Sequence, residues 1–565
     1  MTRYVLGVNI GFHDSSAALL GDGALRWLVE QERVSRRKHA LAQPPVEAVR
    51  ACLDAEGIGP ESLEAIAVGW DFSGTPLAGN RRFTDEGMRT LLFGTDAPET
   101  MPPIRWIPHH LAHAASTCYV NGEPEAAVLV MDGAGETQST SVGVARDGEI
   151  KLLREWPVSQ SLGFFYTAAS KWAGFGDWGT GKLMGLAAYG RPQGGMPVRR
   201  TGEGYEISVD GAPLSIEGPS GRRAAMGPLM AYFPGFEAAV RPSFCGHFPY
   251  QERQGEEPIA YADFAASAQE ALEEAVLGLV ADLREQHDVP ALAVAGGVAM
   301  NCTMIGRLVR ESPFERVYVP PVPTDAGVSL GAALVVAREA GRFAPQPLDH
   351  AYWSTPIGAD EAAAAASAEG LVVRRLDGDE LARVTARSLA DGKIVAWARG
   401  RGEVGQRALG TRSILADPRN RRNLERLNLI KGREMWRPVA PSVLGERIDD
   451  LMATPVGEPA RFMLAAGTVR GELRRSVPAV THVDGSARPQ YVDRATNPGY
   501  WSMIEEFRHV AGVPLVVNTS LNLAGEPIVH SAADAVSTFV RGSDLDLLVL
   551  DDLVVARSET ELPEP

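Results

Sequence analysis

Apolar residues make up 45% and charged residues 22% of the 565 residues, ordinary globular values that exclude a disordered or fibrous chain. The formal net charge of −16 argues against a dedicated nucleic-acid binder, because such proteins need a basic surface. The sequence contains no apolar run of about 18 residues, so it predicts no membrane span. Asn9, His13 and Asp14 interrupt the stretch in which a signal peptide needs its apolar core. The four cysteines form no CxxC pair, as is typical of a reducing compartment, so we expect a cytoplasmic enzyme.

Two segments of the first half share one pattern. Residues 4–31 and 126–155 each contain an apolar strand, a loop of Gly, Asp or His, a second strand, a DG hairpin turn and a third strand. Because helical sequence separates the copies, we interpret them as a duplicated α/β core. A chance similarity of two β-meanders is the alternative.

PHHLAHAA contains His109 and His113, which a helix would place on one face, one turn apart. The zinc-protease pattern needs Glu after the first His, and the chain has His110 there, so a metalloprotease is disfavoured. Asp132, which ends a predicted strand, and Asp325, in the loop PTDAG, could complete a metal site. A structural histidine pair is the alternative.

Residues 161–190 are dense in glycine and aromatic residues around Lys182. A lysine in a glycine-rich loop can bind phosphate, but the P-loop spacing is absent because Leu183 follows. A loop packed by its own aromatic side chains is the alternative.

Two more glycine clusters follow. LAVAGGVAMNC, at residues 292–302, stands between a predicted strand and a predicted helix, and residues 320–334 lead into a helix of small residues. Glycines let backbone N–H groups approach phosphate, and helix N-termini add a favourable dipole. With the first two loops, these clusters predict a cleft between two like-built halves, as in the actin and sugar-kinase ATPase fold.

The character of the sequence changes near residue 346. Residues 346–357 lie in a proline-containing stretch without periodicity, which predicts a linker. We therefore expect one domain over residues 1–345 and a second, again mixed α/β, over residues 358–565.

The second domain contains a charge anomaly. From Arg399 to Arg437, 11 basic and 4 acidic residues give +7 within a chain of net charge −16. Arg407, Arg412 and Lys431 would converge with Arg437 if the predicted strand and the following helix fold back on each other. Arginine clusters recognise phosphate or carboxylate groups, so we predict a small-anion pocket. A polyanion is the alternative, but no aromatic–basic interleaving supports it.

Two polar patches, at residues 481–490 and 516–528, belong with this pocket. Asn518, Thr519 and Ser520 follow a buried-looking strand, where open α/β sheets place ligand-binding side chains. Turn chemistry alone could explain either patch.

These segments together resemble the NodU/CmcH family of carbamoyltransferases over nearly the full length. The shared motifs are, in order, HDSSAALL, PHHLAHAA, MDGAGE, GKLMGLAAYG, GGVAMN, PTDAGVSLGAA, RALGTRSILADPR, IKGREMWRPVAPSVL, THVDGSARPQ and NTSLNLAGEPI. The resemblance implies an α/β fold: an N-terminal actin-like ATPase domain made of duplicated RNase H-like halves, similar to the tRNA threonylcarbamoyl-transferase, and a C-terminal YrdC-like domain.

The resemblance also implies a reaction in two halves. The second domain would convert carbamoyl phosphate and ATP, with Mg²⁺, into carbamoyl adenylate. The first domain would transfer the carbamoyl group to an acceptor hydroxyl at a metal site, with His109, His113, Asp132 and Asp325 as the ligands. Ferrous iron is the first choice of metal, and manganese or zinc would also suit these ligands.

The family pattern implies three further groups of residues. His13 and Lys38 would lie near the transferred carbamoyl group, and the ordinary histidine pKa, about 6.5, suits His13 to act as general base. The adenylate would be bound by Lys182, Gly297 and Asn301. Carbamoyl phosphate and ATP would be bound by Arg407, Lys431, Arg437, Arg488, Asn518 and Ser520.

The chain departs from the family pattern in two places. GQRALGTRS has Gln406 and Thr411 where the family usually has Pro and Asn, but both arginines remain. Residues 191–260 match poorly, and we expect them to shape the acceptor pocket. His247 is the residue there to test, although a surface histidine is the alternative.

The acceptor expected from the resemblance is a hydroxyl of a secondary metabolite, as in antibiotic biosynthesis. A macrolide or its sugar is the first choice, and an aminoglycoside or a cephem the second. A tRNA-modifying carbamoyltransferase is disfavoured by the charge of −16. A nucleotide-gated binding module is the alternative from another class. A homodimer is only the most frequent oligomeric state.

Overall fold

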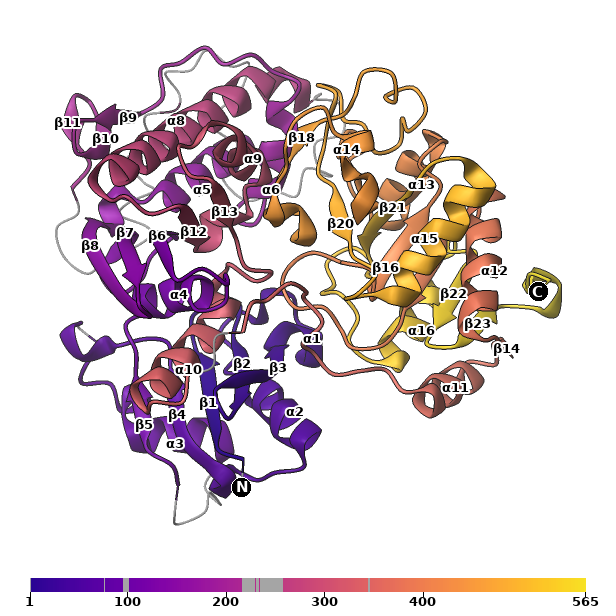
Figure 1. The fold of residues 1–565 in the computed structure, drawn as a ribbon, viewed down its shortest axis with the longest axis horizontal. Helices are drawn as coiled ribbons and strands as arrows, with labels where there is room; N and C mark the ends of the chain where they lie inside the picture. The colour runs from indigo at the N-terminus through magenta and orange to yellow at the C-terminus, as the bar shows by residue number, and fades with distance from the viewer. Residues whose placement is uncertain are drawn as a thin grey trace.

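The computed structural model of the protein describes residues 2–75, 77–94, 101–215, 229, 233, 258–343 and 346–564. His247 lies outside the described residues, as does most of the stretch 191–260 in which we expected the acceptor pocket. The chain forms three large β-sheets, two in the first part of the sequence and one in the second (Figure 1). Among the described residues, no helix is both long and apolar enough to cross a membrane.

The first sheet has five strands in the order β3-β2-β1-β4-β5. The first three strands are antiparallel, and β4 and β5 run parallel to β1. The strands are β1 (Tyr4–Asn9), β2 (Ser16–Gly21), β3 (Ala24–Glu30), β4 (Leu63–Val68) and β5 (Ile104–Trp106). The helices that follow them are α1 (Gln31–Ser35), α2 (Val46–Glu56) and α3 (Asp85–Phe93).

The second sheet has the same arrangement of strands as the first sheet. Its order is β13-β12-β6-β7-β8, again an antiparallel meander extended by two parallel strands. The strands are β6 (Glu125–Met131), β7 (Gln138–Arg146), β8 (Glu149–Pro157), β12 (Ala291–Ala295) and β13 (Arg316–Tyr318). Each meander turns on an Asp-Gly pair with positive φ at both residues, 51° and 81° at residues 22 and 23 and 51° and 72° at residues 147 and 148. Such pairs favour tight hairpins, and the predicted duplication is confirmed.

The segment around Lys182 is helical, so its interpretation as a loop was wrong. Lys182 lies on α6, which packs against α5 and α8. The helices of this half are α5 (Leu162–Trp172), α6 (Thr180–Ala187), α8 (Ala262–Gln286) and α9 (Cys302–Glu311). A small sheet beside α8 is formed by β9 (Val198–Thr201), β10 (Gly204–Val209) and β11 (Ala212–Pro213).

Two helices join the halves of the first part. Helix α10 (Val328–Glu339) packs against β1 and against α4 (His109–Cys118), which in turn packs against β6 and β12. Gly331 makes the close approach of α10 to α4 possible, because a Cβ built there would lie 1.8 Å from the carbonyl oxygen of Ala112. The position of α4, and of the histidines on it, therefore depends on a glycine contact.

The second part of the chain is a mixed eight-stranded sheet, in the order β14-β23-β22-β15-β16-β21-β17-β20, as expected for this fold class. Its strands are β14 (Val372–Arg375), β15 (Val395–Ala398), β16 (Arg412–Ala416), β17 (Ala440–Leu444), β20 (Gln490–Val492), β21 (Leu515–Ser520), β22 (Leu547–Leu550) and β23 (Leu553–Ala556), with a separate pair β18 (Gly467–Thr468) and β19 (Ser486–Ala487). Its helices are α11 (Ala359–Ala368), α12 (Gly378–Ala390), α13 (Arg422–Ile430), α14 (Ile448–Leu451), α15 (Pro498–Ala511) and α16 (Ala532–Arg541).

Helix α1 holds the loop that precedes β16. A guanidinium nitrogen of Arg33 donates to the carbonyl oxygen of Gly405, and the Gly405 N–H donates to Glu30 at 3.0 Å. Gly405 has φ +88°, and a Cβ there would lie 2.3 Å from the carbonyl oxygen of Pro321. Since Arg407 follows two residues later, these contacts position a predicted anion-binding residue against the first part of the chain.

The Gly331→Ala variant tests the contact between α10 and α4. The added methyl would force the helices apart, and we expect the free energy of unfolding to fall by about 1–3 kcal/mol. Urea unfolding followed by circular dichroism measures the change. The control is Gly378→Ala, at the start of α12, where nothing lies within 4 Å of the built Cβ. Equal unfolding midpoints for the two variants would contradict the close approach.

Candidate functional site

One cavity of about 1100 Å³ lies where the two parts of the chain meet. It is lined from both parts, and every described residue predicted for the site lines it except His109, His113 and Arg412. The two histidines are fully buried behind its wall. Residues that are far apart in the sequence therefore line one cavity.

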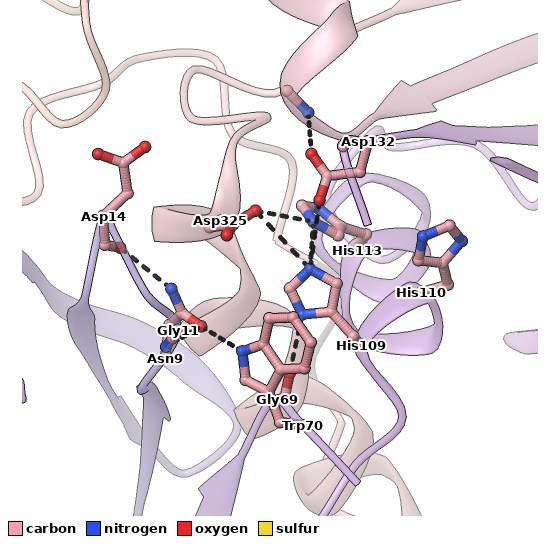
Figure 2. A network of polar contacts seen from close by, with 12 residues as sticks. Asn9, Gly11, Asp14, Gly69, Trp70, His109, His110, His113, Asp132 and Asp325 are labelled. Atoms are coloured by element: carbon pink, nitrogen blue, oxygen red, sulfur yellow. Dashed lines mark hydrogen bonds and ion pairs between the residues drawn. The ribbon is translucent and has the colours of Figure 1, made fainter. Parts of the chain in front are cut away.

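A cluster of two histidines and two aspartates lies at the cavity, which its two aspartates line. His109 and His113 lie on α4, Asp132 follows β6, and Asp325 precedes α10. Their ligand atoms all lie within 4.8 Å of one another. The two imidazole Nε2 atoms are 3.2 Å apart, and both approach the Asp325 carboxylate, at 3.7 and 3.5 Å. Figure 2 shows these side chains converging, with His110 directed away.

The spacing of this cluster fits a metal ion. Four ligands around a tetrahedral ion with bonds of about 2.0–2.2 Å lie about 3.3–3.6 Å apart, and His109 Nε2 is 3.6 Å from Asp132. The carbonyl oxygen of Gly69, 3.1 Å from His109 Nδ1, accepts the ring proton and leaves the Nε2 lone pair directed at the carboxylates. Imidazole with carboxylate suits iron, manganese or zinc.

The charge of the cluster also calls for a cation. Burial lowers the pKa of His109, but Asp132 and Asp325 outweigh that effect and raise it to about 10. The two carboxylates therefore favour a cation beside them, either a proton on the imidazole or a metal ion in its place. His110, on the same helix, is different: burial and the two neighbouring histidines lower its pKa, and its Nδ1 lies 2.7 Å from the hydroxyl of Ser141.

The His113→Asn variant tests this cluster as a metal site. Removing one ligand should weaken binding of Fe²⁺, Mn²⁺ or Zn²⁺ at least about tenfold, since even residues that only orient metal ligands contribute that much. Elemental analysis after equilibrium dialysis gives the metal content per chain. His110→Asn is the matched control, a buried histidine on the same helix but outside the cluster, and should keep the wild-type content. Equal metal loss in both variants would count against the assignment.

His13 lies beside the metal cluster. Its Nδ1 is 3.3 Å from Asp14 and 3.9 Å from Asp325. Burial lowers the pKa of His13, but these carboxylates and Asp132 raise it to about 9. We expected His13 to act as general base with an ordinary histidine pKa. In the folded chain its pKa is higher than that.

Lys38 lines the cavity near the basic side chains of the second domain. Burial lowers its pKa, and Arg437 and Lys182 lower it further, which places all three in one electrostatic environment. Lys182 connects the two parts of the chain, because its Nζ donates to Glu434 of the second part at 2.6 Å.

Gly297 and Asn301 form the wall between these charged ends. The Gly297 N–H donates to Asp132 at 3.0 Å. The Asn301 amide exchanges two hydrogen bonds of 2.9 Å with Gln269, and its oxygen caps α9. A ligand in the cavity would meet a short backbone turn and a rigid amide.

Four of the predicted basic side chains, all from the second part of the chain, line the cavity: Arg407, Lys431, Arg437 and Arg488. Burial, and then the neighbouring Arg488, lower the pKa of Arg407 to about 9. Nε of Arg407 and Nε of Arg488 have no hydrogen-bond partner within the described part of the chain. Unpaired buried N–H groups on crowded cations are the setting in which a phosphate or carboxylate is bound.

Lys431 and Asn518 are both held by hydrogen bonds, Lys431 to the end of β21 and Asn518, within β21, to its neighbours. Lys431 Nζ donates to the backbone oxygen and the hydroxyl of Ser520, at 2.7 and 3.0 Å, and to Asn522. The Asn518 amide donates to the carbonyl oxygen of Ala408, at 3.0 Å, and to the side chains of Ser442 and Gln490. Ser520 and Asn522 therefore hold the Lys431 ammonium in place.

One predicted member of the basic cluster lies elsewhere. Arg412 is 1% exposed and donates to carbonyl oxygens that include those of Arg399 and Gly400, so its guanidinium is part of the framework. The prediction missed Arg433, which lines the cavity and whose pKa is lowered to about 9 by burial and by Arg437. It also missed Asn522. Arg433 belongs to the same charge run, so the sequence offered a signal for it.

Comparison with known proteins gives consistent matches. The family models described as "Carbamoyltransferase N-terminus" and "Carbamoyltransferase C-terminus" match residues 75–334 and 386–557. The chain is 35% identical to nodulation protein NolNO of Sinorhizobium fredii, over 98% of this chain and 80% of that protein. It is 35% identical to nodulation protein NolO of Bradyrhizobium diazoefficiens, over 81% of this chain and 80% of that protein. A solved structure of HypF from T. kodakarensis is similar at 14% identity and a TM-score of 0.33, over 61% of this chain and 48% of that one.

Proposed function

The chain belongs to the carbamoyltransferase family and is a carbamoyltransferase, and from this premise we propose that it uses carbamoyl phosphate and ATP to carbamoylate a hydroxyl of a secondary metabolite. The observation that carries the proposal is one cavity lined both by two aspartates of the His/Asp cluster, which we call its His/Asp end, and by the basic cluster, which we call its basic end. Each end suits one half of such a reaction.

The basic end, in residues 358–565, takes the donor half. Carbamoyl phosphate, ATP and one water give carbamoyl adenylate, pyrophosphate and phosphate. Arg407, Arg437 and Arg488 bind the phosphate oxygens, and Lys431, fixed by Ser520, supports them. These cations also stabilise the charge that develops on the phosphates.

The His/Asp end, in residues 1–345, takes the transfer half. The acceptor hydroxyl and the adenylate give the carbamate ester and AMP. A metal held by His109, His113, Asp132 and Asp325, ferrous iron by preference, supplies a Lewis acid when bound and neutralises the carboxylates that raise the pKa of His13. His13 takes the hydroxyl proton, and Lys38 holds the carbamoyl oxygen.

Between the two ends, Lys182, Gly297 and Asn301 bind the adenylate as it passes within the cavity. The intermediate then never enters bulk water, which would hydrolyse it. A macrolide or its sugar is the proposed acceptor, with an aminoglycoside or a cephem as the alternative.

A split assay tests the two halves separately. Without an acceptor, pyrophosphate release and carbamoyl adenylate, followed by mass spectrometry, report the donor half. Arg437→Ala should lower adenylate formation at least about tenfold, because a charge-assisted contact to phosphate is lost. His113→Asn should leave adenylate formation within about twofold of wild type and abolish transfer.

Arg422→Ala is the matched control for the basic cluster. Arg422 belongs to the same charge run but is exposed on α13, outside the cavity lining, and both halves should keep their wild-type rates. Wild-type protein, folded and loaded with metal, that forms no adenylate would refute the proposal. So would equal loss of the donor half in Arg437→Ala and His113→Asn.

A further inference from the structure

Trp178 is an exposed aromatic side chain at the transfer end of the cavity. It lines the cavity and is 46% exposed. One side of its indole stacks on the ring of His39, with centroids 4.0 Å apart and an angle of 14° between the planes. Its ring centroid is 5.2 Å from that of His13, and the two planes are nearly perpendicular. An indole this open to water, in contact with a reactive histidine, offers an apolar surface where an acceptor has to lie.

The ring of His39 is held rigidly beneath Trp178. Four residues of its loop adopt positive φ: Arg36 (58°), His39 (63°), Ala40 (43°) and Ala42 (54°). Such conformations are strained for residues other than glycine and persist only where surrounding contacts hold them. Here the Asp14 N–H donates to the His39 carbonyl oxygen at 2.8 Å, and His39 Nδ1 is 3.4 Å from the Asp14 carboxylate. The strained loop thus fixes the support of the indole.

Two more exposed apolar side chains belong to the segments around His13. Phe12, next to His13, is 67% exposed, and Leu41, in the His39 loop, is 44% exposed. The two segments are joined by a hydrogen bond of 2.8 Å from the Ala42 N–H to the Phe12 carbonyl oxygen. Neither side chain lines the cavity, but both are exposed on segments that carry lining residues, and exposed apolar side chains near a cavity are typical of ligand-binding surfaces.

We propose that Trp178, supported by His39, is the platform on which the acceptor stacks, and that the acceptor is a carbohydrate, free or attached to a larger molecule. This inference rests on the proposed function and narrows its acceptor. A sugar ring presents a face of C–H bonds to the indole, while its hydroxyl groups point outward from the ring edge. One of them can then reach His13, and others can reach Asp14 and Glu32, which also line the cavity.

The experiment measures carbamoyl transfer to three sugars: methyl α-L-rhamnopyranoside, N,N′-diacetylchitobiose and tobramycin. A cephem that carries a primary hydroxyl serves as the acceptor without a sugar. Wild type should carbamoylate at least one sugar. Trp178→Ala should raise the KM for that sugar at least about tenfold, and Trp178→Phe, which keeps an aromatic face, should stay within about threefold. Leu153→Ala, which removes another exposed apolar side chain, on β8, should match wild type.

Each result separates this inference from the proposed function. An unchanged KM in Trp178→Ala would overturn the platform. Wild type that forms carbamoyl adenylate and carbamoylates the cephem but none of the sugars would overturn the carbohydrate assignment alone. Wild type that forms no carbamoyl adenylate would overturn the proposed function and this inference with it.

Discussion

Buried charge of opposite sign at the two ends of one cavity is the constraint on which the rest of the structure depends. Asp132 and Asp325 lie against two buried histidines at one end. Arg407 and Arg488 lie at the other end with unpartnered Nε atoms. Burying unpaired charge costs several kcal/mol, so such ends are stable features only if ligands of opposite charge complete them. The two ends therefore select a cation and an anion.

The two ends can act on one molecule only if the two parts of the chain keep a fixed relative position. Contacts of buried or stacked arginines between the two parts stabilise that position. Arg33 fixes the Gly405 loop, and Arg36 donates to the carbonyl oxygens of Pro527 and Ile528. The guanidinium of Arg401 lies 3.9 Å from the ring centre of Trp27. Within the charge run, Arg401 thus contacts the first part of the chain, whereas Arg407, Arg433 and Arg437 line the cavity.

Much of the fold could be predicted because its signals are local. The Asp-Gly turns and the alternating strands define both halves within short windows, and the i, i+4 spacing places His109 and His113 on one face of α4. The helix that carries Lys182 was missed because its glycines oppose helix formation, and its packing against α5 and α8 overrides that preference.

Other features of the site depend on contacts between distant residues. The direction of Arg412 follows from the pairing of β16 with β15, where it lies opposite Ala398. The raised pKa of His13 depends on Asp325, which the sequence places more than three hundred residues away. Neither could be read from a single segment, because sheet register and electrostatic neighbours are properties of the folded chain.

The central claim is that both halves of the reaction share the cavity of one chain. It is tested most directly by mixing equal amounts of Arg437→Ala, which lacks the donor half, and His113→Asn, which lacks the transfer half, and measuring carbamoylated acceptor. The account predicts that the mixture stays below about a tenth of the wild-type rate, because an intermediate kept in one cavity gains from a high effective concentration that a second chain does not share. Recovery of most of the wild-type rate would contradict it.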